Sequence, residues 1–72
     1  MVNVQKLKGK IVESEMTIKD LAEKIGINKA TLYRKMAGDG GDFTISEASM
    51  IADVLMLNAT EAQAIFFSQI VA

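Results

Sequence analysis

Apolar residues recur along most of this 72-residue chain at intervals of three and four positions. This interval matches the turn of an α-helix and is typical of helices that bury one face. The chain has no proline, and the glycine-rich stretch GDGGDF at residues 38–43 is the one evident interruption of the pattern. The sequence therefore predicts an all-α domain of five helices joined by short connections.

The first two predicted helices have recognisable ends. Asn3 can cap the first helix, which has Gly9 as a weak point in its interior. Thr17 can cap the second helix, and Asp20 can reach back to the amide of Thr17, which completes a capping box. Gly26 fits the left-handed residue that ends a helix. The predicted inward residues are Val4, Leu7, Ile11 and Val12 in the first helix and Leu21, Ala22 and Ile25 in the second.

The next two predicted helices follow the same rules. Asn28 can cap the third helix, and Gly38 closes it. Thr44 and Glu47 have the spacing of a capping box at the start of the fourth helix. The predicted inward residues are Leu32 and Met36 in the third helix and Ile45, Ala48, Ile51, Ala52 and Leu55 in the fourth.

The connection between the second and third helices is very short. Only Gly26, Ile27 and Asn28 are available for it, and so short a link forces a steep crossing, the geometry of a helix-turn-helix. An ordinary antiparallel helical hairpin is the alternative. We predict a helix-turn-helix at residues 17–37 within a single domain of residues 1–72.

The third helix offers a polar outer face. With Leu32 and Met36 directed inward, the residues left on the outer side are Lys29, Ala30, Tyr33 and Arg34. The first residues of a recognition helix meet base edges in the major groove of DNA. Lys29 and Arg34 can donate hydrogen bonds to guanine there, and a solubilising surface is their alternative role.

Neighbouring residues can add contacts of other kinds. Ala30, or the methyl group of Thr31, can touch the methyl group of thymine. Tyr33 can contact the sugar-phosphate backbone or pack against the helix. As caps, Thr17 and Asn28 place helix N-termini and their free amides near the backbone phosphates.

Residues 17–38, TIKDLAEKIGINKATLYRKMAG, resemble the helix-turn-helix of the Cro/repressor-type (XRE) family of temperate phages and bacteria. The resemblance extends to the opening LKGKIVESEMT and the closing IFF, and small Cro-like and repression-modulating phage proteins are the nearest type. It implies a five-helix lambda-repressor-like DNA-binding domain that binds operator DNA, usually as a dimer. On the matching positions it implies base-reading roles for Lys29, Ala30, Tyr33 and Arg34 and phosphate contacts for Thr17, Asn28 and Thr31.

The chain departs from the family pattern at two places. Family members commonly have an apolar residue where this chain has Lys35, which is followed by Met36. The loop after the third helix often carries basic residues, but here it carries Asp39 and Asp42, which repel DNA unless the glycine amides make the contact. We expect these two aspartates to form a capped acidic turn, with calcium ligation as the alternative.

The last helix, predicted over residues 59–71, can begin after either Asn58 or Thr60, and the sequence leaves this open. Ile65, Phe66 and Ile70 suffice for an inward stripe. Phe67 and Val71 fall about 100° further around the helix, so the apolar band is wider than a small core needs. Exposed apolar patches commonly mark protein interfaces. We expect contacts to a second copy or to a phage repressor, unless these residues complete the core of the monomer. The interface candidates are Phe67, Ile70 and Val71.

Charge divides unevenly along the chain. Residues 1–36 hold all eight basic residues and four acidic ones, a net charge of +4, whereas the remainder holds five acidic residues and no basic one, a net charge of −5. A protein with one side directed at a polyanion shows such a division. A solvated surface with chance segregation of charge is the alternative.

Composition removes several classes of function. The chain has no cysteine and no histidine, which excludes disulfides, Cys/His metal sites and histidine acid–base catalysis. We therefore expect no enzyme activity, cofactor, metal or small-molecule substrate. No apolar run is long enough to span a membrane and no signal-peptide core is present, so we expect a soluble protein of the bacterial host cytoplasm. The initiator methionine and the capped last helix indicate a complete chain, with a truncated repressor head domain as the alternative.

Two functions remain after these exclusions. The first is a sequence-specific DNA-binding transcriptional regulator of a phage lysis–lysogeny switch, with double-stranded operator DNA as its partner. The second is an antirepressor, or modulator, that acts mainly by binding the phage's own repressor protein. The acidic second half of the chain favours the second function, and the outer face of the third helix favours the first.

Overall fold

The computed structural model describes residues 2–37 and 43–70, with backbone alone for residues 67–70. Its helices are α1 (Val4–Glu13), α2 (Ile18–Ile25), α3 (Lys29–Ala37), α4 (Ile45–Val54) and α5 (Ala59–Ile70). The described residues contain five helices and no strand, so the prediction of a five-helix all-α fold is confirmed.

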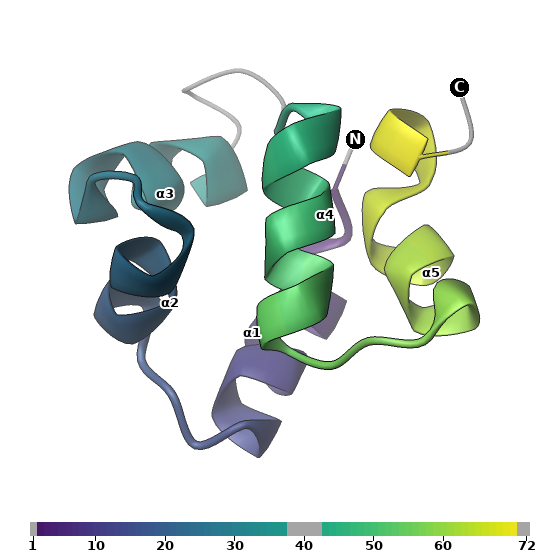
Figure 1. Cartoon of the computed structure of the whole chain (residues 1–72), viewed down its shortest axis with the longest axis horizontal. Helices are drawn as coiled ribbons and strands as arrows, with labels where there is room; N and C mark the ends of the chain where they lie inside the picture. Colours follow the sequence, from purple (N-terminus) through teal and green to yellow (C-terminus); the bar gives the residue numbers. More distant parts are fainter. Residues whose placement is uncertain (1, 38–42, 71–72) are drawn as a thin grey trace.

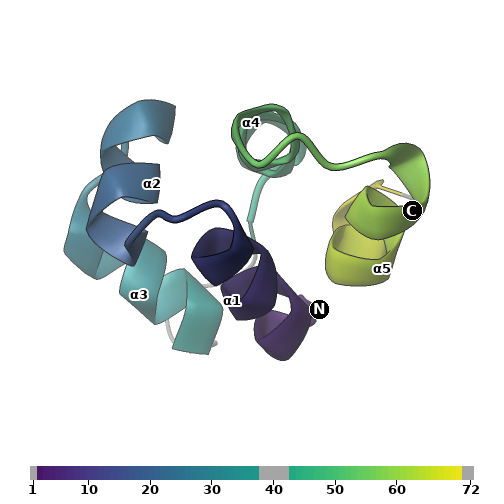
Figure 2. The ribbon, with the colours of Figure 1, turned by 90° about the horizontal axis from the view of Figure 1, so that it is seen from below.

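The five helices are arranged from one end of the molecule to the other (Figures 1 and 2). The α2–α3 pair lies at one end and α5 at the other, with α1 and α4 between them. Helix α2 packs against both α3 and α4, and α5 packs against both α4 and α1. The predicted helix-turn-helix is therefore well separated from the last helix.

One hydrophobic core runs through all five helices. Its centre contains six large, fully buried side chains, which come from all five helices: Leu7, Leu21, Leu32, Ile51, Ile65 and Phe66. Phe43, which lies in the connection before α4, is also buried and packs edge-on against Phe66 with ring centroids 5.6 Å apart. Such edge-to-face pairs are favourable because the positive edge of one ring meets the negative face of the other.

Two residues predicted to face inward do not. Val12 in α1 and Ile45 in α4 are 73% and 71% exposed. Each lies at the margin of its helical stripe, since consecutive residues of an α-helix are rotated by about 100°. Val12 is rotated by that amount beyond the buried Ile11, and Ile45 stands to one side of the arc centred on Ala48, Ile51 and Leu55.

The helix starts follow the predicted caps. Thr17 with Asp20 and Thr44 with Glu47 form reciprocal capping boxes, with hydrogen bonds of 2.9–3.1 Å. The start of α5, which the sequence left open, is decided in favour of Asn58. Its Oδ1 accepts from the amide of Glu61 at 2.8 Å, and the Glu61 carboxylate accepts from the amide of Asn58 at 3.0 Å.

In the part of the chain that the structure describes, three helices end on a residue in the left-handed conformation. Gly26 has φ 78° and ψ 26°, as predicted, and the amide of Ile27 donates to the carbonyl of Ala22 at 3.0 Å. Glu15 after α1 and Met56 after α4 have φ of 57° and 55° without being glycine. Gly38, the predicted end of the third helix, lies outside the described residues.

Helix α5 is kinked at Phe66, where φ is −116° and ψ is 36°. The carbonyl of Ile65, at the kink, accepts a hydrogen bond of 2.9 Å from the backbone amide of Asn3. The kink thereby ties the segment before α1 to the last helix.

Replacement of Gly26 by alanine tests the left-handed turn. A Cβ at Gly26 would meet no atom within 4 Å, so backbone strain alone should decide the outcome. We expect a loss of about 1–2 kcal/mol in the free energy of unfolding, the cost of a left-handed residue with a side chain, measured by urea titration.

The matched control is Gly9→Ala. Gly9 lies within α1, and a Cβ there would also meet nothing within 4 Å. The helical backbone favours alanine by about 0.5–1 kcal/mol, so this variant should be more stable than the parent. If both variants were more stable than the parent, or both less stable, the left-handed conformation assigned to Gly26 would be contradicted.

Candidate nucleic-acid interface

Helix α3 presents one face to the core and the other to solvent. Asn28 precedes it, and the side-chain oxygen of Asn28 accepts from the amide of Ala30 at 2.7 Å. Leu32 and Met36 are buried, as predicted. The outward residues predicted from the sequence are exposed, Tyr33 by 50%; they are Lys29, Ala30, Tyr33 and Arg34. The structure thus brings all four to one free face of α3.

The turn before α3 sets the position of this face. The left-handed Gly26 reverses the chain within three residues, and Ile27 packs on the core from the turn. Ala22 in α2 is buried, and its small side chain lets the two helices approach closely. Helices α2 and α3 cross steeply, as a helix-turn-helix requires, and do not form an antiparallel hairpin (Figures 1 and 2).

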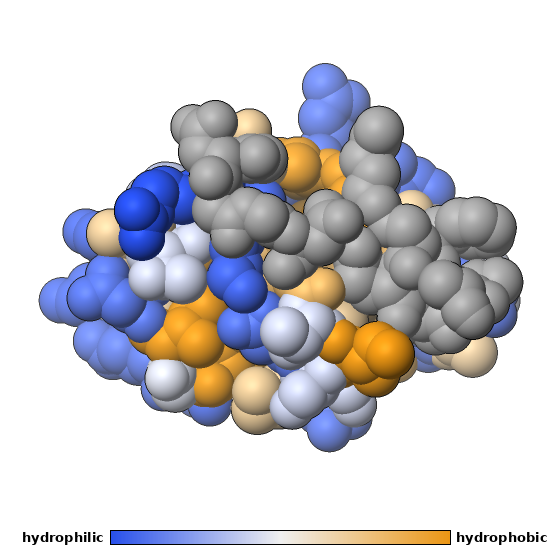
Figure 3. All heavy atoms as spheres, turned by 90° about the horizontal axis from the view of Figure 1, so that it is seen from above, coloured by the Kyte–Doolittle hydropathy of each residue, from blue (hydrophilic) through white to orange (hydrophobic). Residues whose placement is uncertain are grey.

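The face seen in Figure 3 gives the character of this end of the molecule. Strongly hydrophilic side chains lie around the end that carries α2 and α3, at the left of the view, and border an area of apolar side chains. A surface of this kind offers both charge for phosphate and apolar contact for sugars and bases.

The two helix N-termini of the helix-turn-helix differ in charge. The amide of Thr17 donates to the Asp20 carboxylate, and this hydrogen bond is the main reason why the pKa of Asp20 is lowered. The amide of Thr17 is thus bound by Asp20, as predicted, and is not one of the free amides at this helix start. No acidic residue lies in the first turn of α3, so its N-terminus keeps the positive end of the helix dipole uncompensated.

The phosphate candidates can still donate from their side chains. Thr17 and Asn28 are exposed, and Thr31 is half-buried. The hydroxyl of Thr17 accepts from the amide of Asp20, which leaves its own hydrogen to donate. Asn28 uses its side-chain oxygen for the cap, so its side-chain nitrogen carries two further donors.

Lys35, the first of the two departures noted in the sequence, is directed away from the outer face. Its Nζ donates to Oε1 of Glu47 at 2.7 Å and lies 5.9 Å from the centre of the Phe43 ring. The two charged side chains are only 13% and 15% exposed. The ion pair thus joins α3 to the capping box of α4 and takes Lys35 out of the charge available to DNA.

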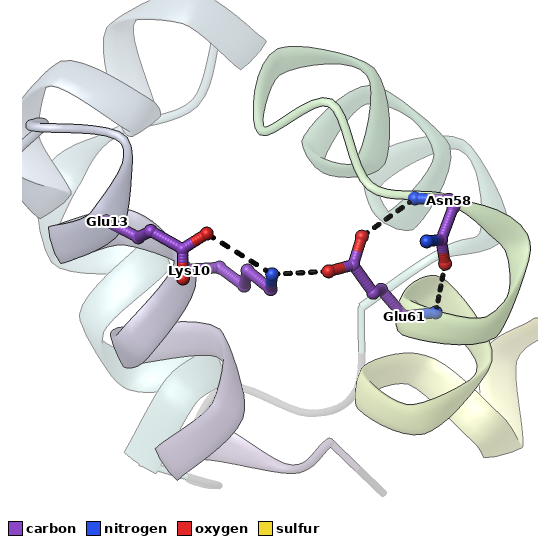
Figure 4. A network of polar contacts seen from close by, with 4 residues as sticks. All are labelled: Lys10, Glu13, Asn58 and Glu61. Atoms are coloured by element: carbon purple, nitrogen blue, oxygen red, sulfur yellow. Dashed lines mark hydrogen bonds and ion pairs between the residues drawn. The ribbon is translucent and has the colours of Figure 1, made fainter.

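A second lysine is bound in the same manner at the other end of the molecule. Lys10 of α1 donates to the carboxylate of Glu61, the capping-box residue of α5, and to Glu13 at 3.5 Å (Figure 4). The hydrogen bond with Glu61 raises the pKa of Lys10 and lowers that of Glu61. Two capping glutamates therefore each hold a lysine from an earlier helix.

The side chains of Phe67 and Ile70 and the whole of Val71 lie outside what the structure describes, as do Asp39 and Asp42. The described residues contain no cluster of three or more potential metal ligands among histidine, cysteine, aspartate and glutamate. Within the same part of the chain, no helix has the length and apolar character needed to cross a membrane.

Comparison with known proteins identifies the arrangement. A family model described as a Cro/C1-type HTH DNA-binding domain matches residues 6–62, from α1 into the first turn of α5. Searches of curated proteins and of solved structures gave no match. The matched region contains the whole helix-turn-helix, with α3 in the position of the recognition helix.

Replacement of Glu47 by glutamine tests the ion pair with Lys35. Glutamine is compatible with a capping box, so the variant removes chiefly the charge that Lys35 binds. We expect a loss of about 1.5–3 kcal/mol in the free energy of unfolding at neutral pH, typical of a hydrogen bond to a charged group. Glu23→Gln, an equal change of charge at an exposed position of α2, should stay within about 0.5 kcal/mol of the parent.

Acid should destabilise the fold through its capping carboxylates. Burial opposes ionisation of Glu47, but hydrogen bonds from Lys35 and Thr44 outweigh it, so its pKa is lowered, as are those of Asp20 and Glu61. Below about pH 4.5 the unfolded chain therefore binds more protons than the folded one, and stability falls as the pH drops. Urea titrations from pH 7 downward should show a plateau and then this fall, which should be shallower in Glu47→Gln.

Proposed function

Because the chain belongs to the Cro/C1-type helix-turn-helix DNA-binding family, we propose that it is a sequence-specific regulator that binds operator DNA through α3. The observation that carries this proposal is the exposed outer face of α3, backed by the buried Leu32 and Met36 and left uncovered by the other helices (Figure 1). The biological setting we propose is a phage lysis–lysogeny switch in the cytoplasm of a bacterial host.

In the proposed complex the outer face of α3 lies in the major groove. Lys29 and Arg34 donate to guanine O6 and N7, and Ala30 contacts a thymine methyl group. Thr17, Asn28 and Thr31 contact phosphates on either side and fix the register of the helix, and Tyr33 reads bases or contacts the backbone beside them. Since Lys35 is bound to Glu47, the charge that α3 offers to DNA comes from Lys29 and Arg34.

One helix-turn-helix covers one half-site, so the regulator is proposed to act as a homodimer or in a complex with a phage repressor. Helix α5 lies at the end of the molecule opposite α3 (Figure 2). A contact through Phe67, Ile70 and Val71 would therefore leave the outer face of α3 free for DNA.

The second candidate function is an antirepressor that binds the repressor of the same phage. The Asp20 carboxylate at the N-terminus of α2 favours it, because it puts negative charge beside a proposed phosphate contact. Titration of labelled operator duplex with this protein alone, and then with the repressor present, separates the two. Binding by the protein alone supports the regulator, whereas an effect seen only in the mixture supports the antirepressor.

Arg34 provides the test of the outer face. A preferred duplex is first selected from a random-sequence library, and binding is measured by fluorescence anisotropy. We expect Arg34→Ala to lose about 1–3 kcal/mol of affinity for this duplex, the value of one good base contact.

The conservative Arg34→Lys variant is the control for charge. Lysine keeps the positive charge but lacks the planar fork that binds guanine through two hydrogen bonds. It should bind a mixed-sequence duplex as the parent does and still lose preference for the selected one. If Arg34→Ala bound the selected duplex as tightly as the parent, the outer face of α3 would not be the reading surface.

A further inference from the structure

A groove runs between α1 and the helix-turn-helix, beside the outer face of α3. It consists of two adjoining hollows of about 280 and 270 Å³ that share Lys8, Ile18 and Tyr33 as lining residues. We call it the α1–α3 groove. Val12 and Thr17 line one hollow, at the start of α2, and the end of α3 lines the other.

The lining of the α1–α3 groove combines apolar walls with hydrogen-bond donors. Ile18 is half-buried, while Val12 is largely exposed and Tyr33 is half exposed. The lining residues with polar side chains are Lys8, Thr17 and Tyr33, which carry an ammonium group and two hydroxyl groups. Among residues 2–37 and 43–66, no carboxylate lines either hollow, and Asp20, which caps Thr17, is not part of the lining.

The groove between α1 and α5 has the opposite character. It measures about 370 Å³ and is lined by Glu13 and Glu61, which hold the ammonium group of Lys10 (Figure 4). Lys6 lines this groove, although it is only two residues from Lys8 on the same helix. The two faces of α1 therefore differ: one carries ion pairs, and the other carries a lysine beside apolar surface.

We propose that the α1–α3 groove holds a stretch of DNA sugar-phosphate backbone next to the major-groove site. In this arrangement Lys8 and the hydroxyl of Tyr33 donate to a phosphate, and a deoxyribose packs against Val12 and Ile18. The positive charge of Lys8, the hydroxyl donors and the apolar walls match this occupant, and Thr17 and Tyr33 make the groove continuous with the proposed DNA surface. The inference rests on the proposed function and deepens it: Lys8 becomes a DNA-binding residue and Tyr33 a backbone contact.

The test compares Lys8→Gln with Lys6→Gln on a mixed-sequence duplex at several salt concentrations. The two variants change net charge equally and lie on the same helix, but only Lys8 lines the α1–α3 groove. The slope of log K against log salt is negative, and Lys8→Gln should make it less steep by about 0.9, the effect of one lost phosphate contact. Lys6→Gln should keep the parent slope. Equal slopes for the two variants would overturn the proposal and leave the groove to a protein partner.

Tyr33→Phe tests the role of the hydroxyl group. A backbone contact predicts that affinity falls by the same factor for the selected and the mixed-sequence duplex, since phosphates carry no sequence information. A change in the ratio of the two affinities would assign Tyr33 to base reading and overturn this part of the proposal. Thermal unfolding of each variant verifies that the fold is retained.

The outcomes separate this inference from the function on which it rests. If the parent protein binds no duplex, both proposals are wrong. If the parent binds and Arg34→Ala loses selectivity, but Lys8→Gln keeps the parent slope, the proposed function stands and the groove proposal is wrong.

Discussion

The left-handed conformation of Gly26 is the constraint on which the proposed DNA surface depends. It lets the chain turn from α2 into α3 within three residues, and the carbonyl of Ala22 accepts the amide of Ile27 across the turn. With that geometry set, burial of Leu32 fixes the rotation of α3 and so decides which side chains are directed outward. The proposed DNA surface is thus a consequence of one backbone conformation and one buried stripe.

The rest of the domain holds this unit in place with side chains that serve two purposes. Glu47 and Glu61 each complete a capping box and each bind a lysine from an earlier helix. Such a glutamate stabilises the start of its own helix and also fixes the position of another. The arrangement removes Lys35 and Lys10 from the surface charge, so a count of basic residues overstates what is available to a polyanion.

The local features could be predicted from the sequence because their cause lies within three or four residues. The caps at Thr17 and Thr44, the turn at Gly26 and the outer face of α3 belong to this group. The ion pairs of Lys35 and Lys10 join residues 12 and 51 positions apart, and no local pattern announces them. The groove beside Lys8 likewise depends on how α1 meets α3. At Val12 and Ile45, helical spacing gave the right stripe but could not give its width, which depends on the neighbouring helices.

The hydrogen bond from the amide of Asn3 to the carbonyl of Ile65 has a structural consequence. It keeps the amino end of the described chain beside the kink of α5, while Val4, the next residue, lines the same hollow as Tyr33 and Ala37 of α3. A change that straightens α5 at Phe66 would therefore be transmitted to the segment that leads into α1, and through Val4 to the wall of the α1–α3 groove.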